Sequence, residues 1–404
     1  MVVALHAGSN KPEGIFKRLV DESERFDAEP LEIMVNDQKK KFYVRLLLVI
    51  ADAPARADLL KSKQHNAHYG CNWCYVRTKY EADQKSVRYP LITDPKIRTD
   101  DEWRQQIVQT RSLRTVKEKD EGVFGVKGAS ELARLEYVHL NSIAPPEYMH
   151  SQLLGTVALL VESWIGGVAK AANLLDENKV KRINSRLRGI RFPKGQLRTM
   201  PIMGLNENWK AADCENFLLY GFPALEGGLE LDNYLNFLRL VRILATMIQK
   251  NVSIASLVDV RKDIEEFFKE FNSLYSNRMH RFNVHALLHL PEVVEKFGPL
   301  VPCSSFQVEN TMGTLVRKVE TFTNVPQQVM NRIMVDSSLR IFLESKRSSF
   351  SLPFEKFCND VYFNKKSDMN ASPSLERPLP KEGFKLTAEE KQALGIKCAY
   401  LYAR

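Results

Sequence analysis

The feature that most constrains the fold is a long apolar run that ends at an acidic residue. The run extends from Phe42 to Ala51, Arg45 is its only charged residue, and Asp52 follows it directly. A charged stretch precedes the run and a proline follows Asp52 closely, which favours a central β-strand at 41–51. Because open α/β sheets build their sites at the carboxyl ends of strands, we expect Asp52 to be a functional residue.

A second acid, Glu309, stands at the start of a helical pattern late in the chain. Apolar residues at helical spacing follow it: Met312, Leu315, Val316 and Val319. One carboxylate at a strand end and another on a helix are how many nucleases hold a divalent metal at a phosphodiester. We therefore expect Asp52 and Glu309 to be catalytic residues that bind Mg²⁺ or Mn²⁺.

The remaining pattern predicts an α/β beginning joined to a long helical part. Before Asp52 the pattern predicts strands at 2–6, 31–36 and 41–51 and a helix at 14–26, with turn residues at 8–12 and 36–40. From about 101 to 345 the pattern is helical, with one packed face at Leu153, Leu154, Val157, Leu160, Val161 and Trp164. The tail from about 350 is rich in proline and charge, which predicts an extended segment with a last strand at 398–402.

Two cysteines and two histidines fall at regular two-residue gaps in the segment His65 to Cys74. His65, His68, Cys71 and Cys74 offer the soft ligands that tetrahedral Zn²⁺ prefers, but four such closely spaced groups rarely all reach one ion. We expect Cys71 and Cys74 to bind zinc with His68 and a distant group such as His150. The alternative is a reduced, half-buried cysteine pair.

Two further segments carry histidines. Glu147-Tyr-Met-His150 follows two prolines, so Glu147 either begins a helix, where acids and prolines are favoured, or contributes with His150 to a site. His285 and His289 stand four apart, so a helix would place both on one side. Leucines surround them, and we expect these two histidines to serve packing and hydrogen bonding, because the local sequence offers no third metal ligand.

A run of cations without an acid predicts contact with DNA. The run from Lys179 to Arg198 comprises Lys179, Lys181, Arg182, Arg186, Arg188, Arg191, Lys194 and Arg198. Part of it lies on one helical face, and Gly189 and Pro193 then end the helix. Such residues would neutralise backbone phosphates without reading bases, and the alternative is a solvated face. Other cations, such as Arg98 and Arg104, are interleaved with acids and indicate less.

Composition agrees with a folded protein that has a polyanionic partner. The chain has 404 residues, 44% of them hydrophobic, and a net charge of +9. No apolar stretch is long enough for a membrane span, and no leader pattern opens the sequence, so we expect neither membrane insertion nor secretion. Six cysteines are too few for a disulfide scaffold, which favours a reducing compartment, cytosolic or nuclear.

Several separate blocks resemble the transposases of CACTA-type (En/Spm-like) DNA transposons and their relatives, in order and in spacing. The blocks are Leu5–Pro12, Asp52–Arg56, His65–Cys74, Gly125–Ser130, Glu147–His150, Asn283–Leu290 and Phe306–Asn310. The resemblance covers about residues 1 to 345. It implies an RNase H-like catalytic domain with a long helical insertion, which cuts and rejoins DNA in the nucleus.

The resemblance also implies a mechanism and a set of residue roles. Water and then a 3′-hydroxyl would attack phosphorus in line, activated by one Mg²⁺ while a second steadies the leaving oxygen. In the family three acids hold the metals; Asp52 matches the second and Glu309 the third. In Glu147–His150 the family's acid is usually an aspartate, and the glutamate here is one methylene longer. Proteins of this kind commonly act as dimers or larger assemblies.

No acid matches the first of the family's three, because a block that starts at Ala7 leaves no room for its strand. The resemblance therefore implies that this chain is the C-terminal part of a transposase, as a fragment, a mispredicted gene product or a domesticated remnant. We expect RNase H-like strands with Asp52 and the Cys/His loop at 1–80, a helical insertion at 81–300, a closing helix with Glu309 at 301–345 and a tail at 346–404. The alternative function is a non-catalytic DNA- or protein-binding descendant.

Overall fold

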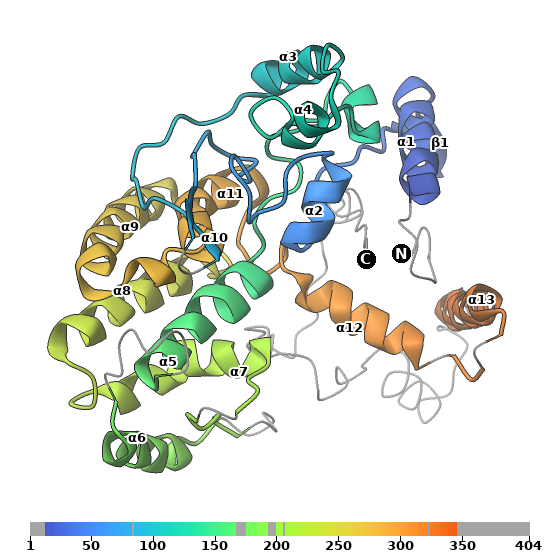
Figure 1. The fold of residues 1–404 in the computed structure, drawn as a ribbon. Coiled ribbons are helices and arrows are strands. Elements are labelled where there is room, and N and C mark those ends of the chain that lie inside the picture. Colours follow the sequence, from blue (N-terminus) through green and yellow to red (C-terminus); the bar gives the residue numbers. More distant parts are fainter. Residues whose placement is uncertain are drawn as a thin grey trace. The chain divides into compact units, whose positions relative to one another are not determined.

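The computed structural model describes residues 13–82, 85–166, 175–192, 199–204, 207–317, 319–321 and 323–345 (Figure 1). These residues form a mixed α/β structure that is mostly helical and contains two small antiparallel sheets. The strands predicted at 2–6 and 398–402 and the tail from 346 lie outside the described residues. So do Lys194 and Arg198 of the basic run.

The first sheet is a hairpin close to the start of the described chain. Helix α1 (Glu13–Ala28) confirms the helix predicted at 14–26, and β1 (Leu31–Val35) confirms the strand predicted at 31–36. β1 pairs antiparallel with β2 (Gln38–Phe42) through a two-residue turn. Asn36 and Asp37 occupy this turn at φ 52° and 59°, the left-handed backbone that such hairpin turns need. The turn is therefore shorter than predicted, and the lysine-rich segment after it forms β2.

The prediction of a strand across 41–51 is wrong beyond Phe42. Residues 43–51 form neither a helix nor a strand, although Leu46 and residues 48–51 are buried. Their side chains pack in the core, and Val49 N–H donates to the carbonyl of Ile143 at 2.9 Å. A strand needs a neighbouring strand for its ladder of hydrogen bonds, and β2 already turns into the β1 hairpin. An apolar run shows that a segment is buried, but it does not supply that partner.

Further along the chain the structure is helical, as predicted for 101–345. A small second hairpin, which the sequence did not predict, joins β3 (Lys79–Glu81) to β4 (Ser86–Arg88). The other α-helices are α2 (Ala53–Leu59), α3 (Asp100–Thr110), α4 (Val116–Glu121), α5 (Ala158–Trp164), α6 (Glu177–Gly189), α7 (Ala211–Asn216), α8 (Leu231–Met247), α9 (Ile254–Leu274), α10 (Phe282–Ala286), α11 (Leu290–Phe297), α12 (Ser305–Val316) and α13 (Val325–Ser345). Two π-helices, η2 (Met149–Val157) and η3 (Phe217–Gly221), and four 3₁₀ turns, η1 (Glu131–Arg134), η4 (Phe222–Leu225), η5 (Asn277–Met279) and η6 (Leu287–His289), connect them.

The chain divides into two compact units. Among the described residues, unit 1 contains Phe192 and those from Phe306 to Ser345, which cover α12 after its first residue and α13. Unit 2 contains the described residues from Glu13 to Arg191 and from Thr199 to Ser305. All the other elements belong to unit 2.

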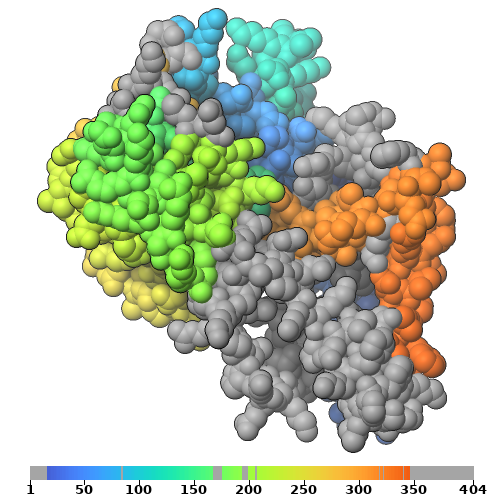
Figure 2. All heavy atoms as spheres, turned by 90° about the horizontal axis from the view of Figure 1, so that it is seen from below, coloured from blue at the N-terminus to red at the C-terminus, as the bar shows by residue number. Residues whose placement is uncertain are grey.

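The helical part of unit 2 packs around an aromatic core. Helices α5, α7, α8 and α9 and the π-helices lie against one another and form one continuous green-to-yellow body in Figure 2. Trp164 and Phe237 meet edge to face at 5.1 Å between ring centroids. The indole N–H of Trp164 donates to the hydroxyl of Tyr275 at 3.1 Å. Five residues of the predicted packed face are buried, and Leu154 is the exception.

Among the described helices, none combines the length and the apolar character that crossing a membrane requires.

Candidate metal centre

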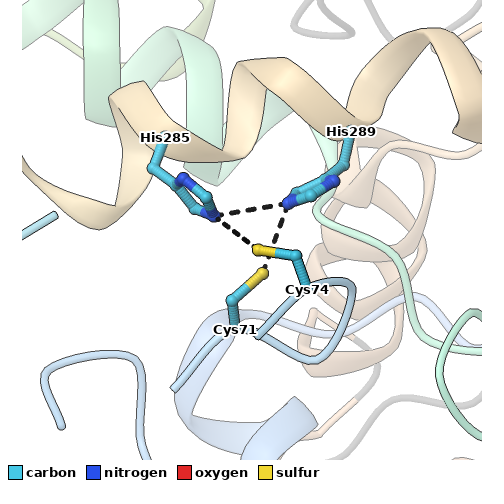
Figure 3. Close-up of side chains that lie close together, drawn as sticks. All are labelled: Cys71, Cys74, His285 and His289. Carbon is cyan, nitrogen blue, oxygen red and sulfur yellow. Dashed lines mark hydrogen bonds between the residues drawn. The ribbon is translucent and has the colours of Figure 1, made fainter. Parts of the chain in front are cut away.

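Four side chains from two distant segments of unit 2 converge at one point (Figure 3). Cys71 and Cys74 come from the loop between α2 and β3, and His285 and His289 come from α10 and η6. The two histidines share a side of the helical stretch because they are four residues apart. In Figure 3 both imidazole rings and both sulfur atoms point into the space between the helix and the loop.

The distances between the ligand atoms fit a tetrahedral metal site. The Nε2 atoms of the histidines are 3.3 Å apart, and Cys71 Sγ to His289 Nε2 and Cys74 Sγ to His285 Nε2 are each 3.4 Å. A tetrahedral zinc ion with ordinary bond lengths would place two nitrogens about 3.3 Å apart and a sulfur about 3.6 Å from a nitrogen. These three distances agree with those expected around a tetrahedral zinc ion, and the cluster could hold a metal ion.

The site is closed to solvent. Each of its four residues is at most 2% exposed. The ring of His285 is stacked on Tyr89 with 5.0 Å between centroids, and His289 lies 5.8 Å from the ring of Trp73. Four protein ligands and no open position are characteristic of a structural metal site rather than a catalytic one.

A buried arginine fixes the cysteine loop. Arg98 is 2% exposed, and its Nε donates to the carbonyls of Cys71 and Cys74 at 3.0 Å each. Its terminal nitrogen also donates to the carbonyl of Phe124 at 2.7 Å. These charge-assisted bonds hold the backbone on both sides of the cysteine pair. The role of Arg98 was not predicted, because no local pattern marks an arginine that will be buried.

A glycine permits the tight fold of the same loop. A Cβ atom on Gly70 would stand 2.3 Å from the carbonyl oxygen of Gln64, which is closer than such atoms can approach. Only glycine therefore fits at this position, directly before Cys71. The tight fold of the loop places the thiol of Cys71 in the cluster.

The pKa values of the two cysteine thiols shift in opposite directions. Burial alone would raise the pKa of the Cys71 thiol, but a hydrogen bond from Cys74 and the charge of His289 outweigh it and hold that pKa well below its usual range. Burial, and then the hydrogen bond to Cys71, raise the pKa of Cys74 well above its usual range. Burial lowers the pKa of His285, which keeps its imidazole neutral. A thiolate and a neutral imidazole are the forms that bind metal.

The predicted ligand set was half right. Cys71 and Cys74 belong to the cluster, whereas His68 and His150 do not: His68 Nδ1 lies 3.0 Å from the Thr78 hydroxyl, and His150 pairs with Glu147. His285 and His289 pack and form hydrogen bonds as expected, and they also complete a four-residue cluster that could hold a metal ion. The histidine pair has no third metal ligand in its own segment, and that was the sequence signal for distant partners.

Glu147 links two helix starts and also contacts His150. Its buried carboxylate accepts the backbone N–H of Met149 at 2.9 Å and of His150 at 2.5 Å, and it contacts His150 Nδ1. The same carboxylate accepts the N–H of Ser305, the first residue of α12, at 3.0 Å. The helix-start interpretation of Glu147 is therefore confirmed, and the residue also holds the beginning of the helix that carries Glu309.

Asp52 lies at the start of a helix instead of the end of a strand. It is the N-cap of α2, and its Oδ1 accepts the N–H of Ala55 at 2.8 Å. Pro54 in the first turn agrees with that start. Asp52 belongs to unit 2 and Glu309 to unit 1. The joint metal site of these two acids stays a prediction.

Within the described residues, the basic run forms helix α6 and the residues just after it. The helix ends at Gly189 as predicted. Two of its lysines have acidic partners. The Nζ of Lys179 lies 3.5 Å from a carboxylate oxygen of Glu230, and the Nζ of Lys181 lies 3.9 Å from one of Glu177. Arg186 donates to backbone carbonyls of the following 3₁₀ segment, including that of Ala224. Arg182, Arg188 and Arg191 are exposed, and their contact with DNA stays a prediction.

Contacts of unit 2 join several of the sequence blocks that carry the resemblance. The cysteine pair and the histidine pair come from the blocks 65–74 and 283–290. Gly125 of the block 125–130 has φ +84°, and a Cβ there would stand 2.5 Å from the carbonyl of Tyr69. Arg56 of the block 52–56 is buried and donates to the carbonyl of Pro145 at 3.0 Å, two residues before Glu147.

No known family model matches this chain, and no curated protein matches its sequence.

Proposed function

We propose that the chain is part of a DNA-processing protein related to CACTA-type transposases, stabilised by a structural zinc ion at Cys71, Cys74, His285 and His289. Zinc fits the site because the ligands are two thiolates and two imidazoles at tetrahedral spacing. When bound, the ion supplies a cross-link and no chemistry of its own. It ties the cysteine loop to the far end of the helical segment.

The observation that carries this proposal is the convergence of sequence blocks. Blocks that lie far apart in the sequence meet at the metal cluster and at Gly125. A chance resemblance would give motifs scattered over the structure. Motifs that contact one another behave as parts of one core, which supports the relationship to the family that the blocks resemble.

On this proposal the α/β part corresponds to a portion of an RNase H-like domain, and the helical part to its insertion. Asp52 and Glu309 would hold Mg²⁺ or Mn²⁺, because hard cations prefer carboxylate oxygens. The carboxylate of Glu147 fixes the backbone of Ser305, the last residue of unit 2 before α12 continues into unit 1. The exposed arginines of α6 would hold the DNA backbone.

Cleavage and strand transfer on supercoiled and linear DNA with Mg²⁺ or Mn²⁺ test this proposal. Asp52→Ala and Glu309→Ala should each lower the rate by more than about a hundredfold, because each removes a ligand of the catalytic metal. Asp232→Ala is the control, since Asp232 lies in the first turn of α8 and belongs to no predicted site. Activity that survives both substitutions would refute the acidic site.

The second candidate is a non-catalytic descendant that binds DNA or protein. The capping role of Asp52 favours it, because that carboxylate already has a structural function in α2. This candidate predicts no cleavage by the unmodified chain and salt-sensitive DNA binding that Asp52→Ala leaves unchanged. Charge loss at Arg182, Arg188 and Arg191 should weaken that binding.

A further inference from the structure

A second site in unit 2 is a cavity of about 450 Å³ beside the metal centre. Three arginines, Arg88, Arg278 and Arg281, line it together with His65, Tyr89 and Phe282. Among the described residues that line it, none is acidic. The guanidinium of Arg88 lies 3.8 Å from the carboxylate of Glu81. The lining therefore brings three cationic side chains together around one cavity.

Two polar atoms of the lining residues lack a hydrogen-bond partner among the described residues. These atoms, Arg88 Nε and His65 Nδ1, are buried. A buried donor that stays unsatisfied costs free energy, so such atoms mark a place where a ligand or water completes the bonding. Burial, together with the nearby Arg56, lowers the pKa of His65. Its ring is therefore neutral and can donate a hydrogen bond without adding charge.

The wall behind these groups is rigid and aromatic. Phe282 lies 5.5 Å from the ring of Tyr89 and 5.6 Å from that of His65, measured between centroids. The guanidinium of Arg56 covers Phe282 at 5.4 Å, and the Tyr89 hydroxyl donates to the carbonyl of His65 at 2.5 Å. These contacts fix the positions of the groups that would meet a ligand.

We propose that this cavity binds a phosphate group. The planar guanidinium groups that line the cavity present paired N–H donors that match phosphate oxygens. A phosphate in DNA and a phosphate on a small molecule share this chemistry. Assigning the phosphate to DNA rests on the proposed function, whereas the phosphate site itself does not.

The metal centre holds the two walls of the cavity together. His65 lies on the loop that leads to Cys71, and Arg281 directly precedes α10, which carries His285. Tyr89 both lines the cavity and stacks on the ring of His285. The proposed zinc ion would therefore fix the spacing between the donors on the two walls, and the experiment uses the metal-loaded protein.

The test compares Arg88→Gln/Arg281→Gln with the matched control Arg77→Gln/Arg111→Gln. Both double variants remove two positive charges, and Arg77 and Arg111 are exposed residues of the same unit that do not line the cavity. Fluorescence anisotropy measures binding of a short single-stranded thymidine oligonucleotide with a 5′-phosphate or a 5′-hydroxyl, and pyrophosphate serves as competitor. Zinc content and thermal melting establish that both variants are folded.

The cavity variant should lose at least about tenfold in affinity for each charge-assisted bond removed, whereas the control should change less than about threefold. A selective loss for the 5′-phosphate form, or an equal loss for both forms, supports a DNA phosphate at the strand end or within the strand. Pyrophosphate binding that depends on the cavity, without oligonucleotide binding, supports the phosphate site and rejects the assignment to DNA. Equal affinities of the cavity variant and the control for every probe would overturn the proposal, whatever the outcome of the cleavage assay.

Discussion

Replacing Cys74 by serine should remove the metal and destabilise unit 2 by about 5 kcal/mol. The ion would join Cys74 to His285 across 211 residues of chain. For a cross-link that closes a loop of this length, the chain-entropy relation gives about 5 kcal/mol. Linkage gives a similar figure, because a metal present at about a thousand times its dissociation constant adds about 4 kcal/mol. Loss of one of the four ligands should therefore lower the free energy of unfolding of the whole of unit 2.

Metal content after dialysis and urea unfolding, each with and without a chelator, measure this effect. Tryptophan fluorescence reports on unit 2, since all four tryptophans lie in the segments assigned to it. Cys214→Ser is the matched control, because Cys214 is a fully buried thiol outside the cluster. The control should keep one equivalent of metal and its response to chelator. The reasoning fails if the unmodified protein retains no metal, or if Cys74→Ser loses the metal and unfolds at the same urea concentration as the unmodified protein.

Three further predictions follow from contacts in unit 2. Burial lowers the pKa of His280 from its usual 6.5 to about 4. Between these pH values only the unfolded chain binds the proton, so acidification from pH 6.5 to 4 should lower the free energy of unfolding by about 3 kcal/mol. Urea unfolding of His280→Phe should show that this part of the pH dependence is lost. Arg98→Met should lower stability by about 3 kcal/mol and weaken metal retention, because buried carbonyls of the cysteine loop lose their donors; unchanged metal retention in a competition with chelator would contradict the positioning role. Arg182→Gln/Arg188→Gln should reduce the slope of log affinity against log salt by about two if α6 contacts DNA phosphates, and an unchanged slope would show that these arginines form a solvated face.

Local patterns predicted that 101–345 is helical and located a few of its helices. The packed face from Leu153 to Trp164, a helix that includes Glu309 and the end of α6 at Gly189 agree with those patterns, although α12 begins at Ser305, earlier than predicted. Each of these features depends on the hydrophobic periodicity and the helix-end residues of a segment of about a dozen residues. Such local signals favour a helix wherever the segment lies in the fold. The short hairpin of β3 and β4 was missed because its strands are only three residues long.

The strand predicted up to Ala51 failed for a different reason. Its apolar residues are buried as expected, but a strand also needs a neighbour, and residues 43–51 bond to Ile143 and pack against side chains without a ladder. Asp52 consequently became a helix cap. The sequence thus determined that this segment is buried and that an acid follows it, and the tertiary structure decided what the acid does.

The metal centre likewise depends partly on local sequence and partly on tertiary structure. The sequence by itself determined two half-sites, because Cys71-x-x-Cys74 and the histidines at 285 and 289 each have the spacing that aims two ligands in one direction. Only the tertiary structure decided that the two halves belong together, since 211 residues separate Cys74 from His285 and no local pattern encodes a contact over that length. The bonds from Arg98 to the cysteine loop and from the Ser305 N–H to Glu147 are long-range contacts of the same kind. Local spacing sets which atoms a segment can offer, and long-range packing sets which of those atoms meet.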